Sequence, residues 1–282
     1  MSRINVPQIL VFVSDLYFSP RIENVAEGLG FRVKIIDGAV EIAPAEVGAS
    51  DEPLGEHLEG QTGRLIERVT AWQPALMIFD LNNGEIPWEQ WIAVLKTSAA
   101  TRRIPILTFG SHKDVGTMGR AKAVGADAVL ARSAFVSDLP NLIRKYARVP
   151  DQGAISEACE GELSALAREG IRLFNAGEYF EAHEVLEHAW NEDTSAAKEL
   201  YRAILQVAVA YLQIERGNYR GAVKMFLRMR QWFEPLPEVC RGVDVAGLRV
   251  AARAVEERLL MLGEEKMGEL DRGSFLPVKI KG

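Results

Sequence analysis

The sequence has few cysteines and no long apolar run, and these two features exclude several classes of protein. It has two cysteines in 282 residues, Cys159 and Cys240, too few for a disulfide framework or for a zinc site of four thiolates. We therefore expect two free thiols, either buried or idle, in a reducing cytoplasm. The longest apolar segment, 203–212, is interrupted by Gln206 and is shorter than the roughly 18–20 residues that span a bilayer.

The chain also lacks an excess of basic residues. It has 33 lysines and arginines against 39 acidic residues and a formal net charge of −6, which argues against a protein that coats DNA or anionic lipid. Met1 is not followed by the basic and apolar regions of a signal peptide, so we expect a cytoplasmic protein with no membrane partner. The length fits two domains of roughly 100–200 residues each.

The first half alternates between β-rich runs and segments with helical spacing. The expected strands cover residues 9–13, 32–36, 76–79, 104–108 and 128–130. The expected helices cover residues 21–29, 63–72, 88–98, 113–124 and 136–146. Continuous apolar runs are typical of parallel strands that are buried on both faces. We predict an α/β domain over 1–148 with a five-stranded, doubly wound parallel sheet, and a long surface loop over 37–61.

The β pattern stops near residue 149. Residues 149–161 contain Pro150 and Gly153 and are predicted to form a linker. Helical stretches then follow at 162–175, 179–190, 196–216, 219–233 and 245–262. We predict an antiparallel helical bundle over 162–263, hence an all-α second domain, followed by a poorly ordered tail over 264–282.

Polar residues lie where the predicted strands end. Asp15 follows the first strand, Asp80 follows the third, Thr108 ends the fourth and Arg132 follows the fifth. The carboxyl ends of parallel strands meet at one edge of a sheet, so we expect these side chains to line one crevice.

The segments 9–15, 78–81, 104–108 and 125–132 resemble the receiver domain of response regulators. The resemblance implies that Asp80 is the position phosphorylated by a histidine kinase. It further implies that acids after the first strand hold Mg²⁺, that Thr108 contacts the phosphoryl group, and that a basic residue after the fifth strand balances its charge.

Two departures from that pattern weaken the implied chemistry. Ser14 stands where receivers have a second acid, so one carboxylate ligand for Mg²⁺ is missing. Arg132 stands where receivers have a lysine, and a planar guanidinium is not equivalent to a point charge. We predict a degenerate receiver in which Asp80 and Arg132 form an ion pair. Mg²⁺ at Asp15 and Asp80, with phosphorylation of Asp80, is the alternative.

The second set of candidate residues lies on one predicted helix, residues 181–190 (EAHEVLEHAW). His183, Glu187 and Trp190 share a face because they are spaced at i, i+4 and i+7, and Glu184 lies beside them. The segment is not the zinc motif HExxH, since Glu187 stands where that motif needs its second histidine. A transition metal bound by His183 and Glu187 is an open alternative.

The segments 174–190, 203–208 and 217–222 resemble the domain of unknown function 309 family, a helical bundle of unestablished role. The family's hallmark positions correspond here to Asn175, Phe180, His183, Glu184, Glu187, Trp190, Gln206 and Asn218. Gln213 stands where that family often has a histidine. The residues predicted to line a pocket in the bundle are Asn175, His183, Glu184, Glu187, Trp190, Gln206 and Gln213. The structural alternative is a buried polar network that fixes the register of the helices.

These patterns favour a regulatory or signal-coupled binding protein without an assigned cofactor. Its first domain would contact a protein partner or its own second domain, and its bundle would bind a small ligand or a partner. The alternatives are a metal-dependent enzyme around His183, Glu184 and Glu187, and a working phospho-acceptor at Asp80. A homodimer also stays open. A basic stripe at Arg220, Lys224 and Arg228 is interpreted as a solvated face, because the acidic chain disfavours a nucleic-acid partner.

Overall fold

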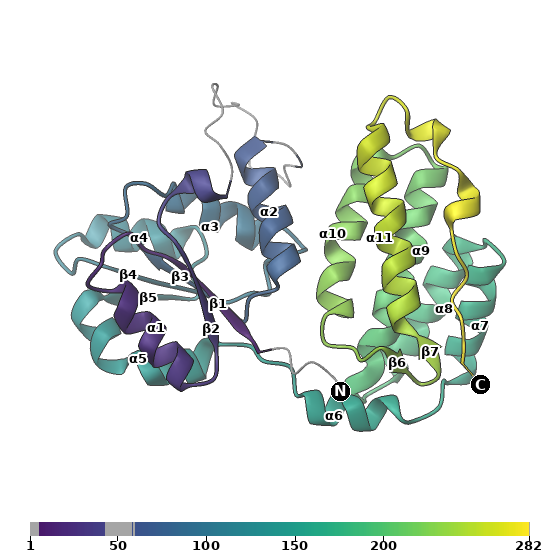
Figure 1. Ribbon diagram of the computed structural model, residues 1–282, viewed down its shortest axis with the longest axis horizontal. Helices are drawn as coiled ribbons and strands as arrows, with labels where there is room; N and C mark the ends of the chain where they lie inside the picture. The colour runs from purple at the N-terminus through teal and green to yellow at the C-terminus, as the bar shows by residue number, and fades with distance from the viewer. Residues whose placement is uncertain (1–5, 43–57, 59, 282) are drawn as a thin grey trace. The chain divides into compact units, whose positions relative to one another are not determined.

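The protein was analysed as a computed structural model that describes residues 6–42, 58 and 60–281 (Figure 1). The chain divides into two compact units, Met1–Val149 and Pro150–Gly282.

The first unit is built on a five-stranded parallel sheet. Its strands are β1 (Gln8–Phe12), β2 (Arg32–Ile36), β3 (Leu76–Asp80), β4 (Ile106–Gly110) and β5 (Ala128–Ala131). Their order in the sheet is β2-β1-β3-β4-β5. All residues of β3 and β4 are buried, which explains why these strands are apolar without alternation. The predicted sheet is confirmed.

Helices cover both faces of this sheet. They are α1 (Ser19–Gly28), α2 (Gly60–Trp72), α3 (Trp88–Thr97), α4 (Val115–Ala123) and α5 (Arg132–Tyr146). One apolar core joins the sheet to α2, α3 and α4 and includes Phe12, Phe79 and Trp91. A second core joins the other face to α1 and α5 and includes Ile22 and Phe135. The doubly wound arrangement is therefore confirmed.

Most of the loop predicted over residues 37–61 lies outside the described residues. The described part contains a short 3₁₀ helix, η1 (Ala39–Glu41), whose Glu41 carboxylate accepts a hydrogen bond of 2.6 Å from the Asp37 N–H.

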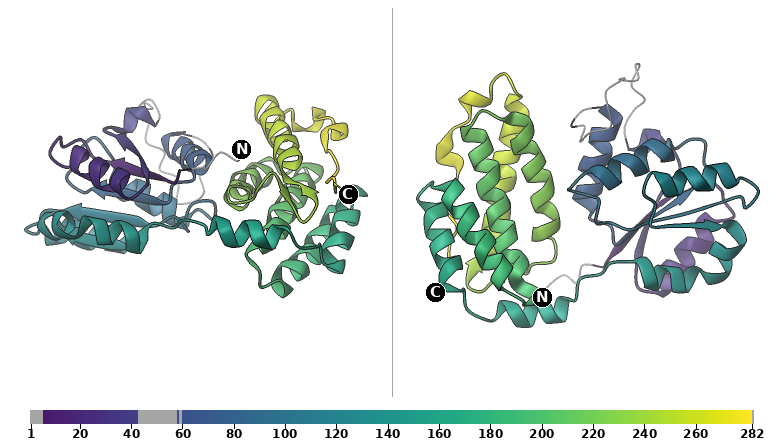
Figure 2. Two further views of the ribbon diagram at one scale, coloured as in Figure 1. Left: turned by 60° about the horizontal axis from the view of Figure 1, so that its bottom comes forward. Right: turned by 180° about the vertical axis from the view of Figure 1, so that it is seen from behind.

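The second unit is a helical bundle. Its helices are α6 (Gln152–Cys159), α7 (Ala165–Asn175), α8 (Tyr179–Glu192), α9 (Glu199–Glu215), α10 (Tyr219–Phe233) and α11 (Val245–Leu262). Short 3₁₀ helices lie at η2 (Ala196–Lys198), η3 (Met267–Glu269) and η4 (Arg272–Ser274). Most residues of α9 are buried, and α8 and α10 pack beside it (Figure 2). The predicted bundle is confirmed.

Close packing between α7 and α8 depends on one glycine. A Cβ atom added to Gly170 would lie 2.6 Å from the Cγ atom of Leu186, a separation that real Cβ atoms do not show. The absence of a side chain at this position therefore lets the two helices approach each other.

The segment predicted to be a linker is largely helical. Asp151 begins α6 by accepting a hydrogen bond of 3.0 Å from the Ala154 N–H, and Ile155 and Cys159 are buried at an i, i+4 spacing. The helix ends at Cys159, which forms a disulfide with Cys240 in the strand β6 (Val239–Cys240). The expectation of two free thiols is wrong, because the fold brings together cysteines that are 81 residues apart.

The expectation of a poorly ordered tail after residue 263 is also wrong for the described residues. Leu270 and Val278 are buried, and the Val278 backbone forms two hydrogen bonds with the Asn175 side chain. Ile280 makes an antiparallel bridge with Val243, which begins the strand β7 (Val243–Asp244). These contacts hold the segment against the bundle.

Within the described part of the chain, no helix combines the length and the apolar character needed to cross a lipid bilayer.

Candidate functional site

The order of the strands places one crevice at the carboxyl edge of the sheet. The chain runs outward from β1 to β2 in one direction and from β1 through β3 to β5 in the other. Ligands of open α/β sheets bind at such a reversal, outside the carboxyl ends of the two central strands. Here the two central strands are β1 and β3. Asp15 follows the end of β1, and Asp80 is the last residue of β3.

Asp80 is the last residue of β3 and is 3% exposed. One carboxylate oxygen, Oδ1, accepts a hydrogen bond of 2.9 Å from the Asn82 N–H. The other oxygen, Oδ2, lies 3.6 Å from Nη2 of Arg132, the first residue of α5. The predicted ion pair between Asp80 and Arg132 is therefore present, at a distance that is long for a direct hydrogen bond.

Burial is the main influence on the pKa of Asp80 and raises it above its ordinary value. The Asn82 N–H and the Arg132 guanidinium act in the opposite direction, whereas the negative charge of Asp15 adds to the increase. The net effect is a raised pKa, so the ionised form of this carboxyl is less favourable in the folded protein than in the unfolded chain.

This raised pKa predicts that Asp80→Asn stabilises the first unit at neutral pH. The Asp80 carboxyl favours folding below its unfolded pKa, and this contribution is lost as the pH rises through the raised folded pKa. We expect the Asn variant to unfold at a higher temperature than the wild type at pH 7. The gain should shrink as the pH falls toward 3. Thermal unfolding followed by circular dichroism at several pH values tests this, and a lower midpoint at pH 7 would contradict it.

The acids and amides around Asp80 are engaged with one another. The exposed Asp15 accepts a hydrogen bond of 2.8 Å at Oδ1 from the Tyr17 N–H. The Ser14 hydroxyl donates to Oδ1 of Asn83 at 3.2 Å, and the Asn83 side-chain amide donates to the Asp37 carbonyl at 3.0 Å. One oxygen of Asp15, the Ser14 hydroxyl and the Asn83 side chain thus already make hydrogen bonds within the protein.

Sequence reasoning did not identify Asn83 as part of this crevice. Its side chain is 3% exposed and also accepts a hydrogen bond of 3.0 Å from the Glu85 N–H. The run Asn82-Asn83-Gly84 directly after Asp80 was a usable signal, because asparagine side chains often hydrogen-bond to the backbone two residues on.

Thr108 does not end the fourth strand, contrary to prediction. Strand β4 continues to Gly110, and Thr108 lies opposite Phe79, one residue before Asp80. The Thr108 side chain is fully buried and donates a hydrogen bond of 3.1 Å to the Ala128 carbonyl. The residue at the end of β4 is Gly110, which has no hydroxyl, and a Cβ there would lie 3.2 Å from the Leu81 Cβ.

Arg132 packs on an aromatic ring as well as facing Asp80. Its guanidinium carbon lies 5.3 Å from the centre of the Phe18 ring, a distance at which a cation–π interaction contributes. The side chain is 39% exposed, so the guanidinium also reaches solvent. Arg132 therefore lies between Asp80, the Phe18 ring and solvent, where its charge partly balances that of Asp80.

In the bundle, the structure places Trp190 beside a cation that the sequence did not single out. The guanidinium carbon of Arg202 lies 4.2 Å from the centre of the Trp190 ring and 4.0 Å from the centre of the Trp232 ring. Nζ of Lys198 lies 5.5 Å from the Trp190 ring. Trp190 is thus part of a stacked arrangement of α8, α9 and α10, held by packing and cation–π attraction.

Three other pocket candidates have defined surroundings. Asn175 binds the backbone of Val278, and Gln213 accepts a hydrogen bond of 2.8 Å from the Asn218 side chain at the turn before α10. Oε1 of Gln206 is buried and has no hydrogen-bond partner among the described residues. Asn175 therefore binds the C-terminal segment of its own chain, and Gln213 binds the turn before α10. Asn175 is exposed and Gln213 is half-buried, so these two contacts do not form the buried polar network of the structural alternative.

His183, Glu184 and Glu187 lie on α8, with His183 half-buried and both glutamates exposed. Within residues 6–42, 58 and 60–281, no group of three or more histidine, cysteine, aspartate or glutamate side chains is placed to hold a metal ion. A metal at His183 and Glu187 would therefore need ligands from elsewhere.

The strand order and the aspartate at the end of β3 define the first unit as a receiver-like α/β domain. In the second unit, residues 167–225 match the model of the family described as domain of unknown function (DUF309). This match covers α8 and α9 completely and includes most of α7.

Solved structures of receivers are similar to about half of this chain. The Mn²⁺-bound response regulator Rcp1 is 10% identical, covers 51% of this chain and 96% of its own, and gives a TM-score of 0.38. The CheY-like receiver domain protein of Methanospirillum hungatei JF-1 is 14% identical, with coverages of 50% and 92% and a TM-score of 0.36. The signal receiver domain from Bermanella marisrubri is 20% identical, with coverages of 49% and 96% and a TM-score of 0.36.

Among curated proteins, an uncharacterized protein of Aquifex aeolicus (strain VF5) is 25% identical over 107 residues. The aligned part is 36% of this chain and 29% of that protein, so the chain spans less than a third of the relative's length.

Proposed function

We propose that the protein is a regulatory, signal-coupled binding protein whose receiver-like unit acts as a contact surface and is not phosphorylated. The observation that carries this proposal is the state of Asp80, which is buried, hydrogen-bonded to the Asn82 N–H and paired with Arg132. In this proposal Arg132 permanently balances the negative charge of Asp80, as a bound metal cation would otherwise do.

The residues of the crevice do not fit Mg²⁺ well. This cation prefers octahedral oxygen coordination and is held in phosphoryl-transfer sites by carboxylates. Ser14 is not an acid, and its hydroxyl donates to Asn83, while an Asp15 oxygen already accepts from Tyr17. Gly110 supplies no hydroxyl for a phosphoryl oxygen. We therefore assign no chemical step to a metal at this site.

The helical unit carries the binding role in this proposal. Its support is the match of residues 167–225 to a family of helical domains, together with the densely packed aromatic and cationic side chains of α8, α9 and α10. The receiver-like unit would then contact a protein partner or the helical unit of its own chain, as the sequence analysis predicted.

The proposal is tested with the full-length protein, acetyl phosphate and Mg²⁺. We expect no phosphoryl adduct by intact-protein mass spectrometry and no Mg²⁺ binding by calorimetry. Ser14→Asp is the matched variant, because it restores the missing acid. It should bind Mg²⁺ at least about tenfold more tightly than the wild type, since affinity follows the charge of the ligands. An adduct on the wild-type protein that Asp80→Asn abolishes would refute the proposal.

A further inference from the structure

The C-terminal segment 275–281 packs against α7, α8, α9 and β7 of the helical unit, and the residues that it contacts there are called the groove below. The first anchor of the segment is an aromatic ring. Phe275 stacks on Tyr211 of α9, with ring centres 4.1 Å apart and planes inclined by 8°. Its edge meets Tyr179 of α8 at 6.1 Å. Tyr211 is fully buried and Tyr179 is 7% exposed, so Phe275 packs on a cluster of buried aromatic rings, called the aromatic pocket below.

The backbone of Val278, three residues after Phe275, is hydrogen-bonded through both its N–H and its carbonyl group. The Asn175 side-chain amide donates to the Val278 carbonyl at 3.0 Å, and the Val278 N–H donates to Oδ1 of Asn175 at 2.8 Å. The Val278 side chain is 3% exposed, whereas Leu276 is 49% exposed. The segment therefore has an aromatic anchor and an aliphatic anchor separated by two outward residues.

The segment continues by pairing with the strand β7 and its turn. The Asp244 N–H donates to the Lys279 carbonyl at 2.9 Å, and the Lys281 N–H donates to the Gly242 carbonyl at 2.6 Å. Backbone pairing to an exposed strand, with pockets for selected side chains, is a general mode of recognising extended peptides.

Charges at the two ends of the groove complement the segment. Glu215 lies 3.8 Å from Arg272, and Asp244 lies 3.1 Å from Lys281. The groove thus presents acids at both ends and an aromatic pocket and an amide between them. This arrangement suits a segment with basic residues on either side of its two apolar anchors.

The part of the groove that holds Phe275 and Val278 differs from the segment in its relation to the family match. Asn175, Tyr179 and Tyr211 lie inside the matched region 167–225, whereas the segment 275–281 and its partners Gly242 and Asp244 lie outside it. The Tyr211 hydroxyl is buried and has no hydrogen-bond partner among the described residues, which costs free energy. Phe275 therefore fills the pocket without satisfying it completely.

We propose that this groove is a peptide-binding site for a partner's extended segment of the pattern aromatic-x-x-aliphatic with basic flanks. The chain's own segment 275–281 occupies the site and competes with that partner. This inference deepens the proposed binding role of the helical unit and does not depend on the chemistry of Asp80.

The test uses a synthetic peptide of residues 271–282 (DRGSFLPVKIKG) and the full-length protein. Phe275→Ala in the protein weakens the attached segment about tenfold, and calorimetry should then show binding of the free peptide with an apparent dissociation constant of about 0.1 mM, because the weakened segment still competes. Wild-type protein should bind at least about tenfold more weakly, because the attached segment competes at an effective concentration near millimolar. The peptide with alanine in place of Phe275 should lose binding to the variant at least about tenfold.

Hydrogen exchange on the same proteins separates a displaceable segment from an integral one. In the Phe275→Ala variant, the amides of 275–281 should exchange faster while the amides of α9 stay protected. The control variant Leu276→Ala should change the exchange of neither group of amides. The proposal is overturned if α9 loses protection together with the segment, since the segment would then be part of the core. It is also overturned if the folded variant does not bind the peptide. Neither result bears on phosphorylation of Asp80, so the two proposals fail separately.

Discussion

Reduction of the Cys159–Cys240 disulfide is expected to lower the free energy of unfolding of the helical unit by about 4 kcal/mol. The bond closes a loop between residues that are 81 apart in the sequence. A cross-link over so long a loop restricts the unfolded chain strongly, and folding then has less conformational freedom to remove. Both cysteines lie in the second unit, so the first unit should keep its stability.

Hydrogen exchange of the full-length protein with and without a thiol reductant measures this effect. The slowest amides of α9 report on the helical unit, and those of β1 and β3 serve as the internal control. A Cys159→Ala/Cys240→Ala variant should reproduce the effect of reduction without reductant. Equal losses of protection in both units, or a change in α9 below about 1 kcal/mol, would show that the cross-link does not stabilise the bundle in this way.

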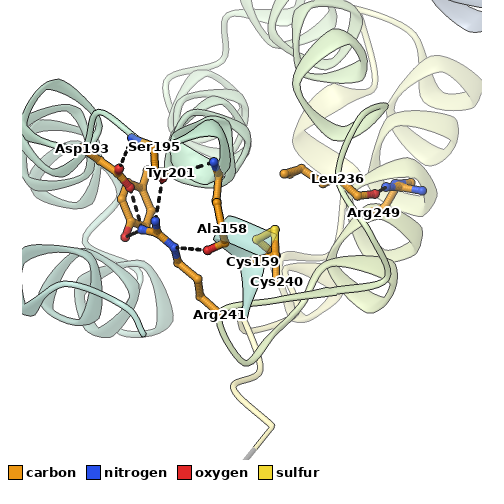
Figure 3. The surroundings of a disulfide bond; sticks show 10 residues. Ala158, Cys159, Asp193, Ser195, Tyr201, Leu236, Cys240, Arg241 and Arg249 are labelled. Atoms are coloured by element: carbon orange, nitrogen blue, oxygen red, sulfur yellow. Dashed lines mark hydrogen bonds and ion pairs between the residues drawn. A yellow bond between two sulfur atoms is a disulfide. The ribbon is translucent and has the colours of Figure 1, made fainter. Parts of the chain in front are cut away.

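Arg241→Ala is expected to destabilise the helical unit by about 3–5 kcal/mol. Nη1 of Arg241 lies 2.6 Å from Oδ2 of Asp193 and also contacts the Tyr201 hydroxyl, and Nη2 donates to the Ser195 hydroxyl at 2.8 Å (Figure 3). The side chains of Arg241 and Asp193 are only 10% and 13% exposed. Removing the guanidinium would leave a largely buried carboxylate without its counter-ion, which accounts for the size of the effect.

The pH dependence of stability gives this prediction a second readout. Burial acts to raise the pKa of Asp193, but hydrogen bonds from Ser195 and Arg241 outweigh burial and leave the pKa lowered. The stabilisation is therefore present above the unfolded pKa and is lost as the pH falls through the lowered folded pKa. In Arg241→Ala this loss on acidification should be smaller, as measured by urea unfolding between pH 7 and pH 3.

Two further variants serve as controls for Arg241. Arg172 donates to Glu169 at 2.8 Å, but both side chains are exposed, so Arg172→Ala should leave stability unchanged within error. Arg241→Lys keeps the charge and loses the planar fork, so it should fall between the wild type and Arg241→Ala. If Arg172→Ala and Arg241→Ala lowered the free energy of unfolding by similar amounts, burial of the ion pair would not determine the loss of stability.

The backbone at Arg241 supports the importance of its side chain. Arg241 and Gly242 form the two-residue turn between β6 and β7, and both have positive φ angles of 50° and 77°. Turns of this kind favour asparagine, aspartate or glycine, because other residues are strained there. An arginine at this position indicates that its contacts with α6 and with Asp193, Ser195 and Tyr201 outweigh the backbone strain.

Sequence reasoning succeeded where structure follows from local periodicity. The expected strand 32–36 is β2 residue for residue, and the expected helices 219–233 and 245–262 are α10 and α11. In α10 and α11 the buried residues recur with the period of a helix, so neighbouring residues carry the information. The burial of β2 does not alternate, and this strand was recognisable from its β-branched residues Val33, Ile35 and Ile36. The ion pair between Asp80 and Arg132 was also predictable, because a parallel sheet brings the ends of its strands together.

The failures concern contacts between distant parts of the chain. Nothing local to Cys159 shows that Cys240 will lie beside it, and nothing local to Val278 shows that Asn175 will bind its backbone. Thr108 was misplaced because an apolar run does not reveal where its strand ends, and a shift of two residues keeps the same face of the sheet. Helix α6 was missed because it is short and begins beside proline and glycine, although Asp151 was a usable N-cap signal.

The position of Arg202 between two indoles has an optical consequence. Of the five tryptophans, Trp72, Trp88 and Trp91 belong to the first unit, whereas Trp190 and Trp232 belong to the second and contact the same guanidinium. Replacing Arg202 by alanine changes the surroundings of both chromophores of the bundle together. The difference between the emission spectra of the wild type and the variant would then report the change at Trp190 and Trp232, while the emission of the three tryptophans of the first unit cancels.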